Sequence, residues 1–318
     1  MESIIQSSVE KAVALLKNGE VVAIPTETVY GLAASIDQPK AIDYIFELKG
    51  RPRTNPLIVH VANLQQAEKL CDTFPDLLKK LAHHFWPGSL TLVLPKSKQV
   101  SQQITAGKNT VGIRIPNHPV LLQVLEKTGP VAAPSANPFE RISPTTAQHV
   151  ADYFPKGLKM VLEGGACQAG IESTIVGFEN GSVIIYRLGA VSTEEIEKVV
   201  GKVAFYNAQK SKVITPGMSK KHYAPKTKTV VTPNIEGFVN QHPTSKIGLI
   251  MFQQSSQLTV FKEVILSPSG NLQEAAQCIY LTLHEFDRLE IDYIVIEPLP
   301  DKELGRSIND RLSRAVHG

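Results

Sequence analysis

Residues 48–61, L-K-G-R-P-R-T-N-P-L-I-V-H-V, place a stiff basic loop directly before an apolar run. Three cations fall within five residues, with no acid between them: Lys49, Arg51 and Arg53. Gly50 and Pro52 break any helix here, and the apolar run 57–61 is typical of a buried strand. The chain must therefore fold so that a rigid cationic loop lies at the mouth of a sheet, where it is suited to hold a polyanion. A solvated basic turn is the simpler alternative.

Apolar runs followed by polar loops recur along the first 200 residues. Residues 21–24 predict a buried strand that runs straight into P-T-E-T-V-Y-G-L at 25–32. Further strands are predicted in the second half of F-W-P-G-S-L-T-L-V-L-P, at 111–116, just after residue 130, and at 160–162, 173–178 and 183–187. Helices are predicted near 40–48, 63–71, 75–85 and 118–127, after Pro144, and behind capping-box spacings at Ser7/Glu10 and Ser192/Glu195. Polar loops that follow buried strands are where open α/β sheets bind their ligands.

The composition changes after residue 200. Residues 201–228 contain seven lysines and no acid, which indicates a linker, although T-P-G-M-S-K-K-H-Y-A-P within it is too specific for a passive tether. Beyond it, short strands alternate with helices, which predicts a small Rossmann-like α/β domain with a largely parallel sheet. We therefore predict a first domain at 1–203, a linker at 204–228 and a second domain at 229–318.

Composition sets the broad class. The chain has 318 residues, 42% of them hydrophobic and 20% charged, which is ordinary for a globular protein. Its net charge is only +3, so no global field points to nucleic acid. The three cysteines are far apart, the N-terminus does not resemble a signal peptide, and no apolar run is long enough for a membrane span. We expect reduced thiols and a cytoplasmic protein.

Several familiar catalytic signatures are missing from the sequence. There is no H-E-x-x-H, no G-x-S-x-G and no G-x-G-x-x-G. Gly165 and Gly170 have P-loop spacing, but Ile171 and Glu172 stand where a lysine and a hydroxyl residue are required. A nucleotide would therefore need another binding scheme.

What the chain offers instead is a set of polar side chains at strand ends. They are the hydroxyls of Thr26, Thr28, Ser135, Ser143, Ser173 and Thr174, the amides of Asn55 and Asn137, the cations Lys49, Arg51, Arg114 and Arg187, and the imidazole of His60, which we expect to be exposed. Carboxylates are scarce among these loops, only Glu27 and Glu172. Such a set suits anionic substrates and a reaction in which charge builds up on phosphate, and it fits poorly with two-carboxylate hydrolysis.

Each candidate has a structural alternative. His60 could be a satisfied histidine that alternates out of a strand, and Arg114 could pair with a neighbouring carboxylate. Ser135 and Asn137 could shape a turn. Trp86 fits a core anchor better than a stacking platform.

Seven sequence blocks, taken in order, resemble the YrdC-like family of threonylcarbamoyl-AMP synthases over about residues 5 to 200. The blocks are P-T-E-T-V-Y-G-L, K-G-R-P-R-T-N-P-L, F-W-P-G-S-L-T-L-V-L, V-G-I-R-I-P, A-P-S-A-N, E-S-T-I-V and Y-R-L-G. The linker and the small C-terminal domain resemble the long, two-domain branch of that family. The resemblance implies a twisted open mixed sheet with a concave basic groove.

The resemblance also implies roles for individual residues. Lys49 and Arg51 are expected to act in catalysis at the ATP phosphates. The nucleotide is expected to contact Asn55, Thr110, Asn137, Ser143, Arg187 and Tyr223 as well. Threonine is expected to contact Thr28, His60, Arg114, Ser135 and Ser173. His222 and Tyr223 are expected to fold over the site as a lid.

The implied enzyme is a nucleotidyltransferase that converts L-threonine, bicarbonate or CO2, and ATP into L-threonylcarbamoyladenylate and pyrophosphate, with Mg²⁺ accompanying ATP. Downstream transferase machinery then modifies adenosine 37 of tRNA to t6A. A groove that binds double-stranded RNA without catalysis, and carbamoyl transfer from carbamoyl phosphate, are the alternatives; the second lacks its usual zinc-finger and acyl-phosphatase modules here. The sequence leaves open which residues contact magnesium and whether RNA binds weakly.

Overall fold

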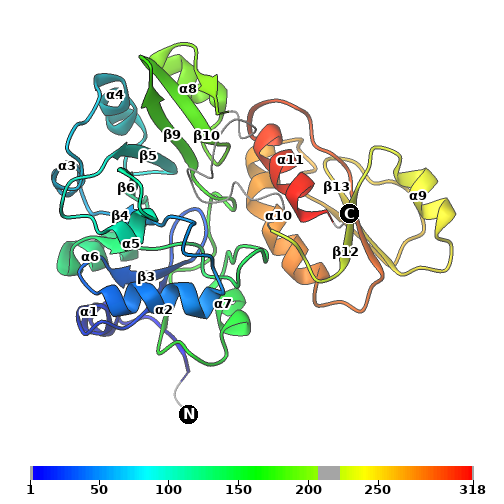
Figure 1. Cartoon of the computed structure of the whole chain (residues 1–318). Helices are drawn as coiled ribbons and strands as arrows, with labels where there is room; N and C mark the ends of the chain where they lie inside the picture. The colour runs from blue at the N-terminus through cyan, green and yellow to red at the C-terminus, as the bar shows by residue number, and fades with distance from the viewer. Residues whose placement is uncertain (1–2, 207–222, 317–318) are drawn as a thin grey trace.

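The computed structural model describes residues 3–206 and 223–316. It contains a large mixed sheet in the N-terminal part and a small parallel sheet in the C-terminal part (Figure 1). None of the described helices is both long and apolar enough to cross a membrane.

The large sheet has eleven strands in the order β1-β8-β2-β3-β7-β4-β6-β5-β9-β10-β11. Its strands are β1 Ile5–Gln6, β2 Val22–Ile24, β3 Gly31–Ser35, β4 Ile58–His60, β5 Leu90–Pro95, β6 Thr110–Arg114, β7 Val131–Ala132, β8 Val161–Leu162, β9 Thr174–Glu179, β10 Ser182–Arg187 and β11 Ala204–Phe205. Parallel and antiparallel neighbours alternate irregularly: β4 pairs with β6 in parallel, and β5 pairs with β6 antiparallel. The predicted mixed α/β sheet is confirmed.

Helices cover both faces of this sheet. They are α1 Val9–Lys17, α2 Pro39–Lys49, α3 Leu64–Lys69, α4 Asp76–Phe85, α5 Gln102–Thr105, α6 Pro119–Thr128, α7 Ala147–Tyr153 and α8 Thr193–Val200. Because strand side chains alternate, Val22 and Ile24 of β2 join the core beneath α1 and α6, whereas Ala23 joins the core on the opposite face.

Two helix starts differ from the prediction. Ser8, not Ser7, caps α1, because its side chain accepts from the Lys11 backbone N–H. Thr146, not Pro144, precedes α7, and its hydroxyl accepts from the His149 backbone N–H. The predicted capping box of Ser192 and Glu195 is present at α8.

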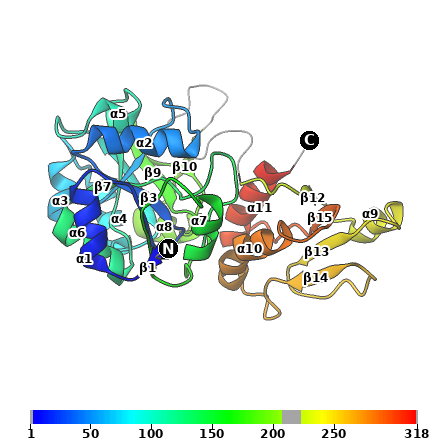
Figure 2. The same cartoon turned by 90° about the horizontal axis from the view of Figure 1, so that it is seen from below.

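The C-terminal part is a four-stranded parallel sheet in the order β12-β15-β13-β14. Its elements are β12 Lys228–Val231, α9 Ile235–Gln241, β13 Ile247–Met251, β14 Lys262–Ile265, α10 Leu272–Phe286, β15 Tyr293–Ile296 and α11 Glu303–Ala315. In both views α10 and α11 lie on the side that faces the large sheet, and α9 lies at the far end (Figures 1 and 2). Their apolar core also includes Val29, Ile142 and Ile171 from the N-terminal part, so the two parts share buried surface.

Candidate active site

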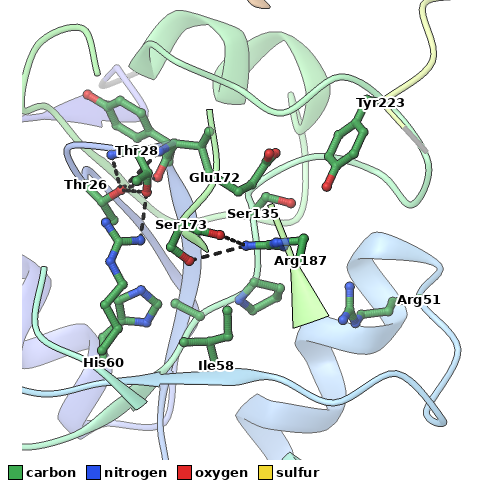
Figure 3. Close-up of a pocket in the computed structure, with 16 residues that line it drawn as sticks. Thr26, Thr28, Arg51, Ile58, His60, Ser135, Glu172, Ser173, Arg187 and Tyr223 are labelled. Atoms are coloured by element: carbon green, nitrogen blue, oxygen red, sulfur yellow. Dashed lines mark hydrogen bonds between the residues drawn. The ribbon is translucent and has the colours of Figure 1, made fainter. Parts of the chain in front are cut away.

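One pocket lies where the loops at several strand ends of the large sheet meet Tyr223 (Figure 3). Its free space amounts to about 580 Å³ when the open mouth is included. The lining consists of Thr26, Thr28, Val29, Tyr30, Gly31, Arg51, Ile58, His60, Arg114, Ala133, Pro134, Ser135, Glu172, Ser173, Arg187 and Tyr223. All five residues predicted to contact threonine are among them, together with Arg51, Arg187 and Tyr223 from the nucleotide set.

Arg114, at the end of β6, makes one ion pair and two hydrogen bonds at the pocket wall. Its Nη2 lies 2.6 Å from Glu27 Oε1, Nη1 donates to the Thr28 hydroxyl at 2.8 Å, and Nε donates to the Gly88 carbonyl at 3.0 Å. Burial acts to raise the pKa of Glu27, but the charge and hydrogen bonding of Arg114 outweigh it and keep that pKa below its ordinary value. A substrate carboxylate would therefore have to share Arg114 with Glu27.

His60, at the end of β4, is buried, with 4% of its surface exposed, so the expectation of an exposed imidazole is wrong. It lies in register with Arg114 across the parallel pair β4–β6, where alternation turns both side chains to the same face. Burial, with the charge of Arg114, lowers the pKa of His60 to about 3, so the ring is neutral near pH 7. Among the described residues its Nδ1 has no hydrogen-bond partner, which leaves that atom for a ligand.

Ser173 and Arg187 bring the two predicted ligand sets into direct contact. Arg187, at the end of β10, donates through Nη2 to the Ser173 carbonyl at 2.7 Å and to its hydroxyl at 3.3 Å. The Ser173 hydroxyl also lies 2.8 Å from that of Thr91 on β5. A residue predicted for threonine therefore touches a residue predicted for the nucleotide.

The three cations of the basic loop, Lys49, Arg51 and Arg53, lie in different environments. Helix α2 ends at Lys49 because Gly50 adopts a left-handed backbone, with φ of 63°. Arg51 then turns into the pocket and donates to the carbonyls of Asn55 at 3.2 Å and Pro56 at 2.8 Å. Arg53 points outward, 59% exposed, and pairs with Asp43. The alternative of a solvated basic turn therefore holds for Arg53 only.

Lys49 is buried and does not line the pocket. Its ammonium donates to the backbone carbonyls of Ser135 and Asn137, and so ties the loop after β7 to the end of α2. Burial, followed by the charge of Arg51, lowers the pKa of Lys49 well below its usual value. The structure gives Lys49 a loop-holding contact that the sequence did not predict.

The remaining nucleotide candidates lie outside the pocket lining. Asn55 and Asn137 are buried, and the side-chain oxygen of each has no hydrogen-bond partner among the described residues. Thr110 lies at the amino end of β6, four residues before Arg114. Ser143 is fully buried and donates to Glu172 at 2.5 Å. His222 lies outside the described residues.

The acids Glu27 and Glu172 also line the pocket, although the sequence analysis gave neither of them a ligand role. Both stand in blocks that the resemblance rests on, P-T-E-T and E-S-T-I-V, so the signal was present. Their partners are distant in sequence and could not be read from it.

The part of the chain that the structure describes shows no metal site built by the protein. The described residues contain no group of three or more His, Cys, Asp or Glu side chains that could hold a metal ion. At the pocket, Glu27 is paired with Arg114 and Glu172 with Arg311. The residues present therefore do not fit a resident metal ion.

Comparison with known proteins agrees with this architecture. Residues 14–189 match the Sua5/YciO/YrdC family model described as "Telomere recombination", and residues 191–316 match the model of the threonylcarbamoyl-AMP synthase C-terminal domain. The threonylcarbamoyl-AMP synthase of Bacillus subtilis is 36% identical, covering 98% of this chain and 93% of its own length. A putative threonylcarbamoyl-AMP synthase of Mycobacterium tuberculosis is 33% identical over 60% of this chain and 88% of its own length.

A solved structure has the same two-domain arrangement. The crystal structure of P. abyssi Sua5 complexed with L-threonine superposes with a TM-score of 0.90 at 34% identity, covering 99% of both chains. Both family models and the full-length relatives lead to one conclusion: this chain belongs to the threonylcarbamoyl-AMP synthase family.

Proposed function

We propose that this pocket joins L-threonine, bicarbonate and ATP into L-threonylcarbamoyladenylate, with release of pyrophosphate. The observation that carries the proposal is the content of a single pocket: every threonine candidate lines it, beside three nucleotide candidates. Two ligands bound in contact can react without a diffusional step, which removes much of the entropic barrier.

Threonine would occupy the end of the pocket formed by Thr28, His60, Arg114, Ser135 and Ser173. The ATP phosphates would lie toward Arg51 and Arg187, and Tyr223 would cover the nucleotide. Lys49, Asn55, Asn137, Ser143 and Thr110 stay proposed nucleotide contacts; for Lys49 and Ser143 this requires that they exchange their present partners.

The chemistry consists of two bond-forming steps. Bicarbonate gives CO2 and hydroxide, and the neutral threonine nitrogen attacks the carbon to form a carbamate, with loss of one proton to the hydroxide. A carbamate oxygen then attacks the α-phosphorus, the bond from that phosphorus to the bridging oxygen breaks, and pyrophosphate leaves with the electron pair. Charge on the phosphoryl oxygens grows in this step, and Arg51 and Arg187 are placed to stabilise it.

Mg²⁺ would enter with ATP, held by phosphate oxygens and water. Magnesium in nucleotide sites commonly keeps several waters and relies on substrate phosphates. The paired states of Glu27 and Glu172 support this assignment over a protein-bound ion.

The product would pass to a tRNA threonylcarbamoyl transferase, and we place the reaction in the cytoplasm. The described cysteines Cys71, Cys167 and Cys278 are free thiols, as expected in a reducing compartment. The division into 1–203, 204–228 and 229–318, and a lid role for the linker, stay predictions, since residues 207–222 are outside the described part.

The test is pyrophosphate release from ATP, measured with threonine and bicarbonate each omitted in turn. Arg51→Ala should lower kcat/KM about 100-fold or more, the usual cost of one transition-state donor. Arg53→Ala is the matched control, because that neighbouring arginine is exposed and paired away from the pocket. Equal activity in both variants, or release that ignores threonine, would contradict the proposal. Salt-dependent retention of double-stranded RNA without turnover would favour the binding alternative.

A further inference from the structure

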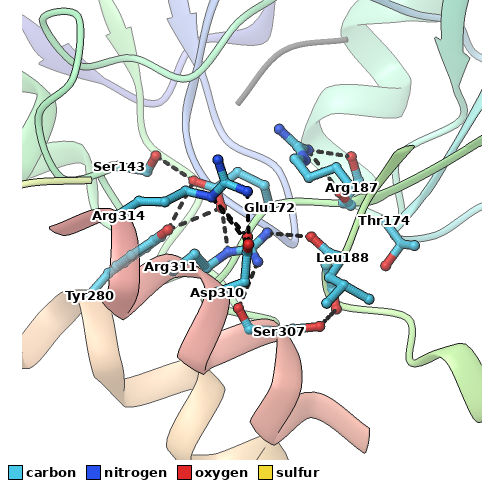
Figure 4. A network of polar contacts seen from close by, with 12 residues as sticks. Ser143, Glu172, Thr174, Arg187, Leu188, Tyr280, Ser307, Asp310, Arg311 and Arg314 are labelled. Carbon is cyan, nitrogen blue, oxygen red and sulfur yellow. Dashed lines mark hydrogen bonds and ion pairs between the residues drawn. The ribbon is translucent and has the colours of Figure 1, made fainter. Parts of the chain in front are cut away.

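The carboxylate of Glu172 is held by the C-terminal domain although it belongs to the large-sheet domain. It lines the pocket one residue before Ser173. Its oxygens accept from Ser143 at 2.5 Å, from the Tyr280 hydroxyl of α10 at 3.1 and 3.3 Å, and from Arg311 Nε of α11 at 2.9 Å (Figure 4). This acid therefore joins helices α10 and α11 to the pocket wall.

Arg311 is fixed by every nitrogen of its guanidinium. In addition to Glu172, Nη1 donates to the Ser307 carbonyl at 2.8 Å and Nη2 donates to the Leu188 carbonyl at 2.9 Å. Leu188 directly follows Arg187 and Glu172 directly precedes Ser173, so Arg311 binds a sequence neighbour of each of these two site residues. The Arg311 side chain is 2% exposed and that of Glu172 is 8% exposed, so this pair is a buried one with little solvent screening.

Tyr280 and Arg311 also pack against the ring of Tyr223. The ring of Tyr280 stacks against that of Tyr223 with centroids 5.8 Å apart, and the Arg311 guanidinium carbon lies 5.7 Å from the Tyr223 ring centroid. Tyr223 is 1% exposed and has a left-handed backbone with φ of 64°, a conformation that a bulky residue keeps only when its surroundings fix it. Arg311 and Tyr280 provide those surroundings from the C-terminal domain.

We propose that Arg311 and Tyr280 are positioning residues for the reaction, and that the C-terminal domain completes the pocket by setting Glu172 and Tyr223 in its wall. The proposal rests on the function proposed above. The electrostatic basis of the proposal is the attraction between the carboxylate of Glu172 and the charge of Arg187. While Arg311 neutralises Glu172, Arg187 stays directed to Ser173 and the nucleotide. Without Arg311, the bare carboxylate would compete with the phosphates for Arg187.

Other contacts between the domains have a different character and supply a control. Arg306 of α11 pairs with Glu194 of α8, and both side chains are about one-third exposed and absent from the pocket lining. Arg306→Met removes an interdomain cation from the same helix as Arg311 without touching Glu172 or Tyr223. This variant therefore shows how much activity is lost when a contact between the domains is removed while the pocket residues keep their partners.

The experiment compares full-length Arg311→Met, Arg311→Lys, Tyr280→Phe and Arg306→Met by pyrophosphate release and by calorimetric titration with ATP and with threonine. Displacement of reacting groups by about 1 Å can cost roughly 100-fold, so we expect Arg311→Met to lower kcat/KM for ATP by about 10- to 100-fold. Arg311→Lys should recover part of this loss, Tyr280→Phe should lose less than Arg311→Met, and Arg306→Met should match wild type.

The double variant Glu172→Gln/Arg311→Met tests the electrostatic step. A neutral amide cannot draw Arg187 away, so the double variant should bind ATP more tightly than Arg311→Met alone. A purely structural role predicts the opposite, because a second member of the network is lost. If Arg311→Met does not fold, Tyr280→Phe is compared with Arg306→Met instead. A lower kcat/KM in Tyr280→Phe supports the positioning role, and equal values overturn it.

The outcomes separate this inference from the proposed function. Wild type without threonine-dependent pyrophosphate release would overturn the proposed function, while the calorimetric titrations would still test the positioning. Active wild type with Arg311→Met equal to Arg306→Met in kcat/KM and in ATP affinity would overturn the inference alone. A double variant no better than Arg311→Met would also overturn it.

Discussion

Lys49→Met separates two roles that sequence and structure assign to the same ammonium. The family resemblance implies that Lys49 contacts the ATP phosphates, whereas in the structure it donates to the carbonyls of Ser135 and Asn137. Methionine keeps the length of the side chain but donates no hydrogen bond, so two buried carbonyls would lose their donor. Each unsatisfied buried acceptor costs about 1–3 kcal/mol, and relief from burying the ammonium offsets part of the total. We expect the free energy of unfolding to fall by about 2–4 kcal/mol.

The loss of this tie should also reach the pocket. Ser135 lines the pocket and belongs to the loop that Lys49 holds, so the loop should shift or loosen when the ammonium is removed. We expect the KM for threonine to rise together with the KM for ATP. A lysine that touches only phosphates would affect ATP and leave threonine binding and stability almost unchanged.

Urea unfolding and steady-state pyrophosphate release on the same preparations measure both effects. Lys40→Met is the control, because Lys40 lies on the same helix and is exposed. If Lys49→Met is as stable as Lys40→Met and loses only ATP affinity, the loop-holding role is refuted. If it loses stability but keeps its KM for ATP, the phosphate contact is refuted.

Three further predictions follow from the same geometry. Arg114→Lys should raise the KM for threonine about 10-fold or more in steady-state assays, because a lysine cannot reach Glu27, Thr28 and Gly88 together; an unchanged KM would exclude Arg114 from the threonine site. His60 is buried and neutral with a pKa of about 3 in the folded protein. Below pH 6.5 the unfolded chain therefore binds more protons than the folded one, and the free energy of unfolding decreases as the pH is lowered. Between pH 7 and pH 5 this protonation lowers the free energy of unfolding by about 2 kcal/mol. In His60→Asn, the free energy measured by urea unfolding should depend less steeply on pH over that range. A chain cut after residue 206 should still give the circular dichroism of a folded α/β domain but lose about 100-fold or more in kcat/KM, since Tyr223 and Arg311 are removed. Full activity would contradict the role given to the C-terminal helices.

The sequence predicted those parts of the fold whose signal is local. The apolar runs at β4 and β9 and the Ser192 capping box required only their neighbours along the chain. Strand β3 was missed because four of the five residues of Gly31–Ser35 are glycine, alanine or serine, which have weak strand preference. It forms because β2 and β7 pair with it on both edges, a tertiary cause that no local window contains.

The residues of the candidate site also fall into those that the sequence predicted and those that only the structure reveals. Residues in recognisable blocks, such as Thr28, Arg114 and Ser135, were predicted and do lie together. Arg311 was not predicted, because nothing near it in the sequence signals a partner, and the residue it pairs with is 139 positions away. The expectation that His60 is exposed failed because a single strand cannot show how deeply the neighbouring strands bury it.

The distribution of ion-pair partners shows how a pocket with two acids could hold the proposed triphosphate. Each acid at the pocket is matched by an arginine: Glu27 by Arg114 and Glu172 by Arg311. Among the described residues, Lys49 and Arg51 instead donate hydrogen bonds to backbone carbonyls, which orient a cation without cancelling its charge. Arg51, whose pKa is lowered only to about 9, therefore keeps its positive charge beside the pocket, in a buried setting where its attraction for an anion is stronger than in water. Because the excess of positive charge at the pocket depends on the Arg311 pair as much as on the loop, nucleotide affinity should be a property of both domains.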